Sequence, residues 1–200
     1  MRKGRNSRMK NTRIIFVVLF VACYGTGWGV GELAAAPQQA AKPAEAKPAW
    51  PSANAKDVES PDAILAAVYD VISGPVGERD WNRFRSLFIP EGRLTAVIEN
   101  AGGNLGYRVM AVEDYVRGAG EYFRKNAFYE REISRKMESF GQIMHVFSTY
   151  ASRKTADGEP FERGINSFQL FNDGKRWWIV SIYWDAERAG NPIPKRYLEK

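Results

Sequence analysis

The sequence has one cysteine, Cys23, and one histidine, His145, among its 200 residues. A disulfide within the chain needs two cysteines, and cysteine-ligated metal sites need several, so both are excluded. The chain has no shortage of apolar residues, since 44% are hydrophobic and 13% are aromatic. Such a chain can bury a core, which excludes wholesale disorder and a disulfide-stapled miniprotein.

Acidic residues are absent from residues 1–13, which carry six of the 29 basic residues. An apolar run from Ile14 to Tyr24 follows directly. Basic residues before a short apolar run are typical of an export signal, and Ala34 and Ala36 form the small-x-small pattern of a cleavage site. The sequence therefore predicts a signal peptide over residues 1–36. Pro37 makes this bond a poor one, so cleavage a few residues away remains an alternative.

Two other interpretations of this segment remain open. The stretch Phe20-Val21-Ala22-Cys23 resembles a lipobox, in which the cysteine is acylated and becomes the new N-terminus. The segment could also stay as an uncleaved anchor, although an apolar run this short spans a bilayer poorly. All three interpretations place the rest of the chain outside the cytoplasm, as a periplasmic, secreted or membrane-attached protein.

Five of the six net positive charges of the chain belong to residues 1–36. Without residues 1–36 the chain keeps 23 basic residues against 22 acidic ones. A chain so close to neutral has no basic stripe for phosphate backbones, so no nucleic-acid partner is expected. Membrane contact is expected only through the signal or a lipid at Cys23.

Composition divides the remaining chain into three parts. Residues 37–60 are rich in Ala, Pro and Lys, have Trp50 as their one large apolar residue, and predict a linker. Residues 61–188 carry the periodic apolar patterns and predict one folded domain. Residues 189–200, with Pro192 and Pro194, predict a tail that lies along the surface or frays.

Apolar residues at helical spacing predict helices over residues 61–72, 81–88 and 112–123. Ser60 and Asp80 are suited to cap the first two. A hairpin is predicted between residues 94–98 and 107–110. After the third helix, apolar residues recur at every second position, which predicts four strands with short turns between them. The predicted strands are residues 128–138, 142–153, 161–171 and 176–184. Consecutive strands with short turns form an antiparallel meander, so we expect an α+β fold with the helices on one face of a curved sheet.

Two segments carry a resemblance to a known superfamily. Residues 173–185 (DGKRWWIVSIYWD) contain an Asp-Gly turn followed by Trp, an Ile-Val pair and a polar strand end, and residues 143–150 (IMHVFSTY) lead into residues 163–168 (RGINSF). Over residues 62–187 the sequence resembles the nuclear-transport-factor-2-like superfamily, which includes ketosteroid isomerase and SnoaL-type cyclases, and it is similar to secreted SnoaL-like proteins of unknown role. The resemblance implies a cone-shaped fold and leaves the function open, because the superfamily contains both enzymes and non-catalytic domains.

The resemblance also implies where a site and an interface would lie. A pocket would form between the helices and the concave face of the sheet, lined by His145, Phe147, Thr149, Asn166, Phe168, Leu170, Val180, Ile182 and Trp184. The opposite face would carry Ile165, Gln169, Phe171, Trp177, Ile179 and Tyr183. That apolar set favours a homodimer.

Few residues offer catalytic chemistry. His145 is a candidate general base because histidine side chains are suited to that role at neutral pH, although a hydrogen-bonded wall residue is the plainer interpretation. The candidate acids are Glu130, Glu132 and Asp185. Glu130 and Glu132 share a face, but the Glu-Arg-Glu order is more typical of a solvated strand with cross-strand ion pairs. No residue matches the catalytic aspartate of the superfamily, which puts catalysis in doubt.

Other candidate sites have structural explanations. Gly102-Gly103-Asn104-Leu105-Gly106 is a hairpin turn rather than a phosphate loop, since no Lys-Ser/Thr pair follows it. Trp177 and Trp178 point to opposite faces of a strand. Arg163 is expected in a salt bridge at the rim. No metal and no cofactor are predicted.

Three hypotheses for function remain. The first is an exported domain that binds a small, largely apolar molecule, lined by Phe147, Thr149, Asn166, Phe168 and Trp184 beside His145. The second is an isomerase or cyclase that uses His145 or a glutamate as general base. The third is a dimeric assembly module whose cavity is filled by its own aromatic side chains.

Overall fold

A computed structural model describes residues 49–100 and 102–199. The predicted signal peptide and Cys23 lie outside the described residues. Within the described part, the chain forms the helices α1 (Ala55–Val58), α2 (Pro61–Ile72), α3 (Trp81–Leu87) and α4 (Val112–Phe123), and the 3-10 turn η1 (Lys195–Tyr197). The strands are β1 (Phe88–Glu99), β2 (Leu105–Ala111), β3 (Tyr129–Phe140), β4 (Ile143–Arg153), β5 (Pro160–Asn172) and β6 (Trp177–Ala186).

The capping residues begin α2 and α3 where the sequence predicts. The Ser60 hydroxyl accepts the backbone N–H of Ala63 at 3.0 Å, and the Asp80 carboxylate accepts that of Arg83 at 2.9 Å. Each bond satisfies a donor that a helix start otherwise leaves open. The buried face of α2 then carries Ile64, Leu65, Val68, Tyr69, Val71 and Ile72, so this helix lies against the core.

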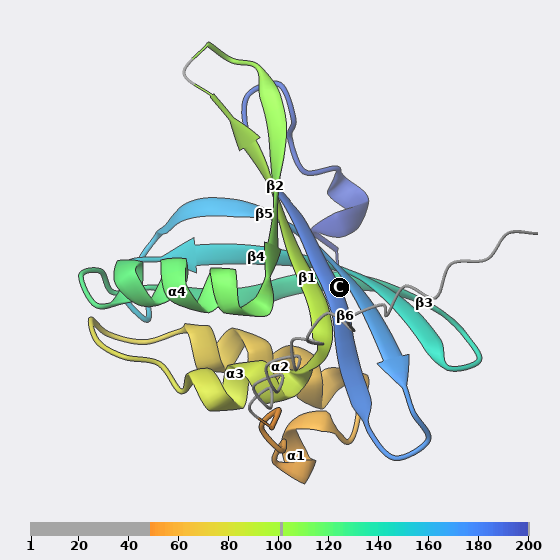
Figure 1. Cartoon of the computed structure of the whole chain (residues 1–200). Helices are drawn as coiled ribbons and strands as arrows, with labels where there is room; N and C mark the ends of the chain where they lie inside the picture. Colours follow the sequence, from red (N-terminus) through yellow and green to blue (C-terminus); the bar gives the residue numbers. More distant parts are fainter. Residues whose placement is uncertain (1–48, 101, 200) are drawn as a thin grey trace, which may run out of the picture. The chain divides into compact units, whose positions relative to one another are not determined.

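The six strands form one sheet in the order β2-β1-β6-β5-β4-β3. The meander β3 to β6 is antiparallel, as expected, whereas β1 and β6 run parallel. Figure 1 shows α2, α3 and α4 on one side of the curved sheet and the β1–β2 hairpin projecting beyond it. The arrangement is α+β, a curved and open sheet with its helices on the concave side, which confirms the predicted fold class.

The first strand is longer than predicted. It begins at Phe88 and includes Pro90, Glu91 and Gly92, where the register to β6 shifts between Phe88 and Arg93. Proline cannot donate to a ladder, so it is tolerated in a strand at such irregularities.

Part of the predicted linker belongs to the folded domain. Asn54 caps the short helix α1, whose Val58 is buried in the core. The indole N–H of Trp50 donates to the carbonyl oxygen of Phe88 at 2.9 Å, and Asp57 pairs with Arg83 at 2.8 Å. These contacts join residues 49–60 to the domain, and composition alone does not reveal them because the partners lie far along the chain.

The last residues lie on the outer face of the sheet, away from the helices. The Thr149 hydroxyl donates to the carbonyl oxygen of Tyr197 at 2.6 Å, and the Ser134 hydroxyl donates to that of Glu199 at 2.6 Å. The ring of Tyr197 lies 5.5 Å from that of Phe147. These contacts hold the C-terminal segment along β3 and β4.

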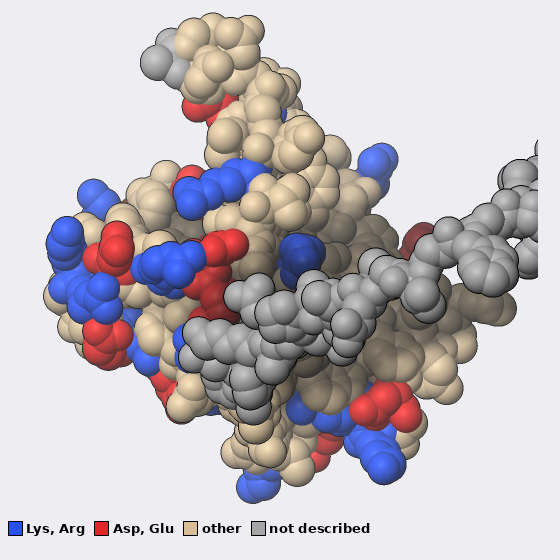
Figure 2. Space-filling view, viewed as in Figure 1, with Lys and Arg blue, Asp and Glu red and all other residues tan. Residues whose placement is uncertain are grey.

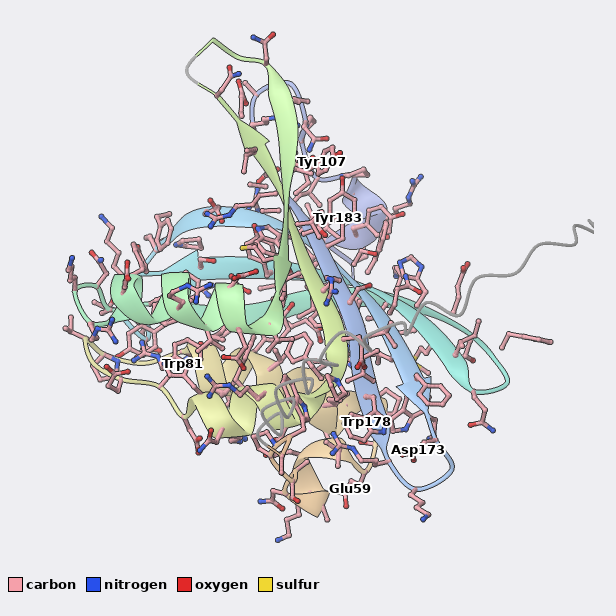
Figure 3. All side chains as sticks on the ribbon, in the orientation of Figure 1. Glu59, Trp81, Tyr107, Asp173, Trp178 and Tyr183 are labelled. Atoms are coloured by element: carbon pink, nitrogen blue, oxygen red, sulfur yellow. The ribbon has the colours of Figure 1, made fainter. Side chains whose placement is uncertain are left out.

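Aromatic packing joins α3 to α4 on the concave side. The ring of Trp81 stacks on that of Phe123 at 6.0 Å, and Phe84 stacks on Tyr115 at 5.2 Å. Figure 3 places Trp81 between the two helices. In Figure 2, basic and acidic side chains intermix over this part of the surface, whereas the projecting hairpin is largely uncharged. No described helix is long and apolar enough to cross a membrane.

Candidate functional site

A cavity of about 450 Å³ lies between the helices and the concave face of the sheet. Its walls come from α2, α3, α4 and all of the strands, and they are mainly apolar. The aromatic side chains that line it include Phe84, Tyr115, Phe123, Phe128, Phe168 and Trp184. A cavity of this size and lining is typical of a small-molecule site.

Three carboxyl groups line the cavity, those of Asp114, Glu130 and Glu162, and the one on β3, Glu130, lies inside it. Its Oε2 accepts the Ser152 hydroxyl at 2.7 Å, and its Oε1 accepts the Asn166 side-chain amide at 3.3 Å. The backbone of Glu130 is held as well, because its N–H donates to the Ser73 hydroxyl at 2.9 Å. The carboxyl group therefore has a defined position at the end of α2.

Burial raises the pKa of Glu130 from its ordinary value of 4.5 to about 7. The bonds from Ser152 and Asn166 act in the opposite direction because they favour the ionised form, and the charge of Glu162 raises the pKa further. Since a pKa near 7 lets a carboxyl group both accept and donate a proton at neutral pH, Glu130 is suited to proton transfer.

A chain of hydrogen bonds leads from Asn166 to the surface. The Asn166 amide also donates to the Tyr69 hydroxyl at 3.1 Å, and the Tyr69 and Ser148 hydroxyl oxygens lie 2.7 Å apart. The Ser148 hydroxyl donates to Glu132, whose carboxylate accepts from Arg135 at 2.6 Å. Burial raises the pKa of Tyr69. Burial therefore keeps Tyr69 protonated although the bonds to Asn166 and Ser148 lower its pKa, and the chain of bonds fixes the Asn166 amide that holds Glu130.

Two further tyrosines of the cavity lie close to carboxylates. The Tyr150 hydroxyl donates to Glu162 at 3.1 Å. Tyr150 can lie there only because residue 164 is a glycine, since a Cβ at Gly164 would stand 2.5 Å from the Tyr150 hydroxyl. Burial, with a smaller effect of Glu130, raises the pKa of Tyr115. The Tyr115 hydroxyl makes no hydrogen bond to a described residue and is available to a ligand.

A second hollow, of about 470 Å³, opens between α2 and β3. It is lined by Asp70, Arg131, Glu132 and Arg135, and it shares Tyr69 and Glu130 with the aromatic cavity. Tyr69 and Glu130 therefore separate an apolar cavity from a polar surface hollow.

Only some of the predicted pocket residues reach the cavity. Asn166, Phe168 and Trp184 line it, together with Ile182. The expectation that His145, Phe147 and Thr149 share this face is wrong, because Phe168 is paired with Val146, and His145 with Gln169. Alternate side chains of a strand point to opposite faces, so an error of one residue in the register of β4 moves all three side chains to the other face of the sheet.

The structure places these three residues on the outer face. His145 Nε2 lies 3.0 Å from the Ser167 hydroxyl oxygen, while Phe147 and Thr149 contact Tyr197. Whether they bind or catalyse stays a prediction, but they do not line the aromatic cavity. An irregularity in the β5–β6 register also turns Ile179 inward, opposite Leu170, although the sequence placed Ile179 outside and Val180 inside.

The two acids of β3 differ from the expected solvated pair. Glu132 does pair with Arg135, but Glu130 points into the cavity without a described basic partner. Asp185 lies in an ion pair with Arg188 at 2.6 Å, and Arg163 pairs with Glu187 at 2.7 Å as expected of a rim residue. The side chain of Trp178 is held by Asp173 and Arg176 at the last hairpin, which explains it structurally.

Sequence reasoning missed Tyr69, Tyr115 and Tyr150 as site residues. Tyr115 falls on a helical apolar stripe, where an aromatic residue is usually a packing residue. The sequence carries no signal that separates a buried tyrosine facing a cavity from one that fills it. Among the described residues, no three His, Cys, Asp or Glu side chains are grouped so that they could hold a metal.

Comparison with solved structures agrees with this architecture. A protein of unknown function from Mycobacterium tuberculosis superposes with a TM-score of 0.50 at 16% identity, over 66% of this chain and 78% of that one. A cystatin-like protein from Caulobacter vibrioides gives 0.48 at 11% identity, over 66% and 90%. An NTF-2 like protein of unknown function from Silicibacter pomeroyi gives 0.43 at 11%, over 63% and 92%. The sequence matches no protein-family model and no curated protein.

The fold and cavity therefore define an open-sheet, cone-type α+β protein with the carboxyl group of Glu130 inside an aromatic pocket. More particularly, the strand order and the helices on the concave side give the cone-shaped architecture that the sequence resemblance implied. At identities this low the likeness concerns the fold alone, so function must be argued from the site.

Proposed function

We propose that this chain is an exported domain that binds a small, largely apolar molecule in the aromatic cavity, with a polar group of the ligand at Glu130. The observation that supports this most is the cavity itself, since an aromatic space of about 450 Å³ contains the Glu130 carboxyl group, which Ser152 and Asn166 hold in position. Apolar walls provide affinity, and a few fixed polar groups orient the ligand.

A binding measurement with and without a filled cavity tests the proposal. The probe is 2-naphthalenemethanol, a neutral bicyclic alcohol. We expect it to raise the melting temperature, because a ligand that binds only the folded state stabilises that state. Ala119→Trp fills the cavity from α4 and should abolish the shift, whereas Glu121→Trp, which does not line the cavity, should retain it. The proposal is overturned if native mass spectrometry shows no retained small molecule and the probe gives no shift, or if the shift survives in Ala119→Trp.

A second function, proton transfer to or from a bound carbonyl compound, is favoured by the raised pKa of Glu130. In this scheme Glu130 removes a proton next to the carbonyl group and the Tyr115 hydroxyl donates to the carbonyl oxygen. Hydrogen–deuterium exchange of 2-tetralone, followed by NMR, tests it. Exchange above the uncatalysed rate that is lost in Glu130→Gln supports this function, and equal exchange by both proteins contradicts it.

A further inference from the structure

The charges that line the aromatic cavity are mostly negative. Glu130 lies inside it and Glu162 lies at its exposed rim. Their partners in the described part of the chain are neutral: Ser152 and Asn166 for Glu130, and Tyr150 for Glu162. No described basic side chain forms an ion pair with either carboxylate.

The other two charged residues of the lining differ in position or in pairing. The Asp114 carboxylate accepts from Arg117 and from the backbone N–H of Ala111, so its charge is satisfied on α4 itself. Arg108 is exposed on β2 and lines the rim. An anionic ligand would therefore find a positive charge only at the rim, at Arg108. The rest of such a ligand would lie toward the carboxyl group of Glu130.

The walls favour the opposite charge. Electron-rich ring faces attract cations, and Tyr115, Phe128 and Trp184 all line the cavity. Tyr115 also has a hydroxyl oxygen without a described hydrogen-bond partner, which can accept an N–H from a ligand. A protonated amine would thus find a carboxylate, a free acceptor and aromatic faces in one space, where a neutral ligand finds only part of them.

We infer that the ligand class of this cavity is a small amine in its protonated form, with the ammonium group at Glu130 and its apolar part against the aromatic walls. The inference rests on the proposed binding function and specifies its ligand. A charge-assisted bond of this kind is stronger than a neutral one, and a desolvated cation gains more from aromatic faces than an exposed one.

The inference carries a pH dependence. Burial holds the pKa of Glu130 at about 7 in the empty cavity, whereas the ammonium group needs the ionised carboxylate. The titratable groups around Glu130 in the cavity are Tyr69 of α2, Tyr115 of α4, Tyr150 of β4 and Glu162 of β5, and burial raises the pKa of the three tyrosines. The adjoining hollow, which Glu130 also lines, adds Asp70, Arg131, Glu132 and Arg135. Affinity for the ammonium should therefore rise as the pH rises through about 7, while affinity for a neutral probe should change little.

Three probes of one shape test the inference by isothermal titration with the chain that begins at Pro37. They are 2-naphthylmethylamine, 2-naphthalenemethanol and 2-naphthoate, which are cationic, neutral and anionic. At about pH 8 we expect the amine to bind about tenfold more tightly than the alcohol, and less of this advantage at about pH 6. Glu130→Gln should remove the advantage. Glu138→Gln, which removes a charge from the exposed end of the same strand, should keep it.

The alternative results separate this inference from the proposed function. If the alcohol or the naphthoate binds at least as tightly as the amine, and Ala119→Trp abolishes that binding, the cavity is a ligand site but the amine class is wrong. If no probe binds, both fail. If Glu130→Gln does not fold, the test uses Glu162→Gln and the pH dependence of binding to the unaltered chain. The inference is overturned if the preference for the amine over the alcohol does not depend on pH and is unchanged in Glu162→Gln.

Discussion

Glu130 and Glu132 lie two residues apart on β3, and their side chains point to the same face of the sheet. Arg135 pairs with Glu132 at 2.6 Å and keeps it part of a surface network. Among the described residues, the Glu130 carboxyl group forms no ion pair and accepts hydrogen bonds only from Ser152 and Asn166. Glu130 and Glu132 are chemically alike, but they differ in their surroundings. Glu132 is part of a surface ion pair, whereas burial in the cavity raises the pKa of Glu130.

The raised pKa of Glu130 predicts how stability depends on pH. The unfolded chain releases this proton near pH 4.5, and the folded chain keeps it up to about pH 7. Between these values the folded state binds more protons, so the free energy of unfolding falls as the pH rises, by about 3 kcal/mol at most. Urea unfolding at about pH 5 and pH 8 measures it.

Glu130→Gln should be less sensitive to pH than the unaltered chain, because it cannot ionise. Glu138→Gln serves as the control and should behave like the unaltered chain. If Glu130→Gln loses as much stability between the two pH values as the unaltered chain does, the carboxyl group does not titrate in this window, and its suitability for proton transfer is lost with it.

At the scale of elements, prediction succeeded where the pattern is local. The periodic apolar residues of α2 and the caps Ser60 and Asp80 depend on neighbours within a few positions, and these elements form where expected. The faces of β4 depend on which residue of β5 stands opposite. The structure pairs Ser148 with Asn166, and the expected set of inward residues on β4 was one residue off.

Helix α1 leads to a prediction about the domain boundary. A chain that begins at Ser60 keeps the cap of α2 but loses three contacts: Trp50 with Phe88, the burial of Val58, and Asp57 with Arg83. We expect it to be less stable than a chain that begins at Ala49 by about 3 kcal/mol, from lost apolar burial and one buried hydrogen bond.

Thermal or urea unfolding of the two chains measures the difference. Trp50→Ala in the longer chain is the matched variant and should show part of the loss. Equal stability of the two chains would mean that residues 49–59 only lie against the domain without stabilising it.

At the scale of the whole molecule, the outer face of the sheet bears on the expected homodimer, which stays a prediction. A hollow of about 280 Å³ on this face is lined by Phe147, Ile165 and Tyr183 and by Pro192 to Pro194 of the C-terminal segment. The chain therefore covers part of the proposed interface itself. The side chain of Tyr183 is still 48% exposed, and that of Tyr107 on the hairpin is 73% exposed. Both residues lie toward the projecting end of the sheet (Figure 3). A second copy would have to pack there or displace the C-terminal segment.

The proposed export of the chain predicts its mature mass. Residues 1–13 supply the basic flank and residues 14–24 the apolar run, so a signal peptidase should remove residues 1–36 or a few residues more or fewer. Native mass spectrometry of the protein from its own compartment should show a chain that begins near Pro37. An acylated N-terminus at Cys23 would identify a lipoprotein instead, and an intact Met1 in the cytoplasm would contradict export. The same spectrum reports whether the chain is a dimer.

The sequence by itself determined what depends on near neighbours: the order of three helices, a hairpin and a meander, the caps, the turns and the excess basic charge of the first residues. The family resemblance placed Asn166, Phe168 and Trp184 on the concave face, and these three residues line the cavity. Only the tertiary structure decided that Glu130 lies in an aromatic cavity beside Tyr115, that His145 lies outside it, and that Trp50 belongs to the core. The physical reason is that strand register, desolvation and partner choice are set by residues far apart in the chain, which no local pattern records.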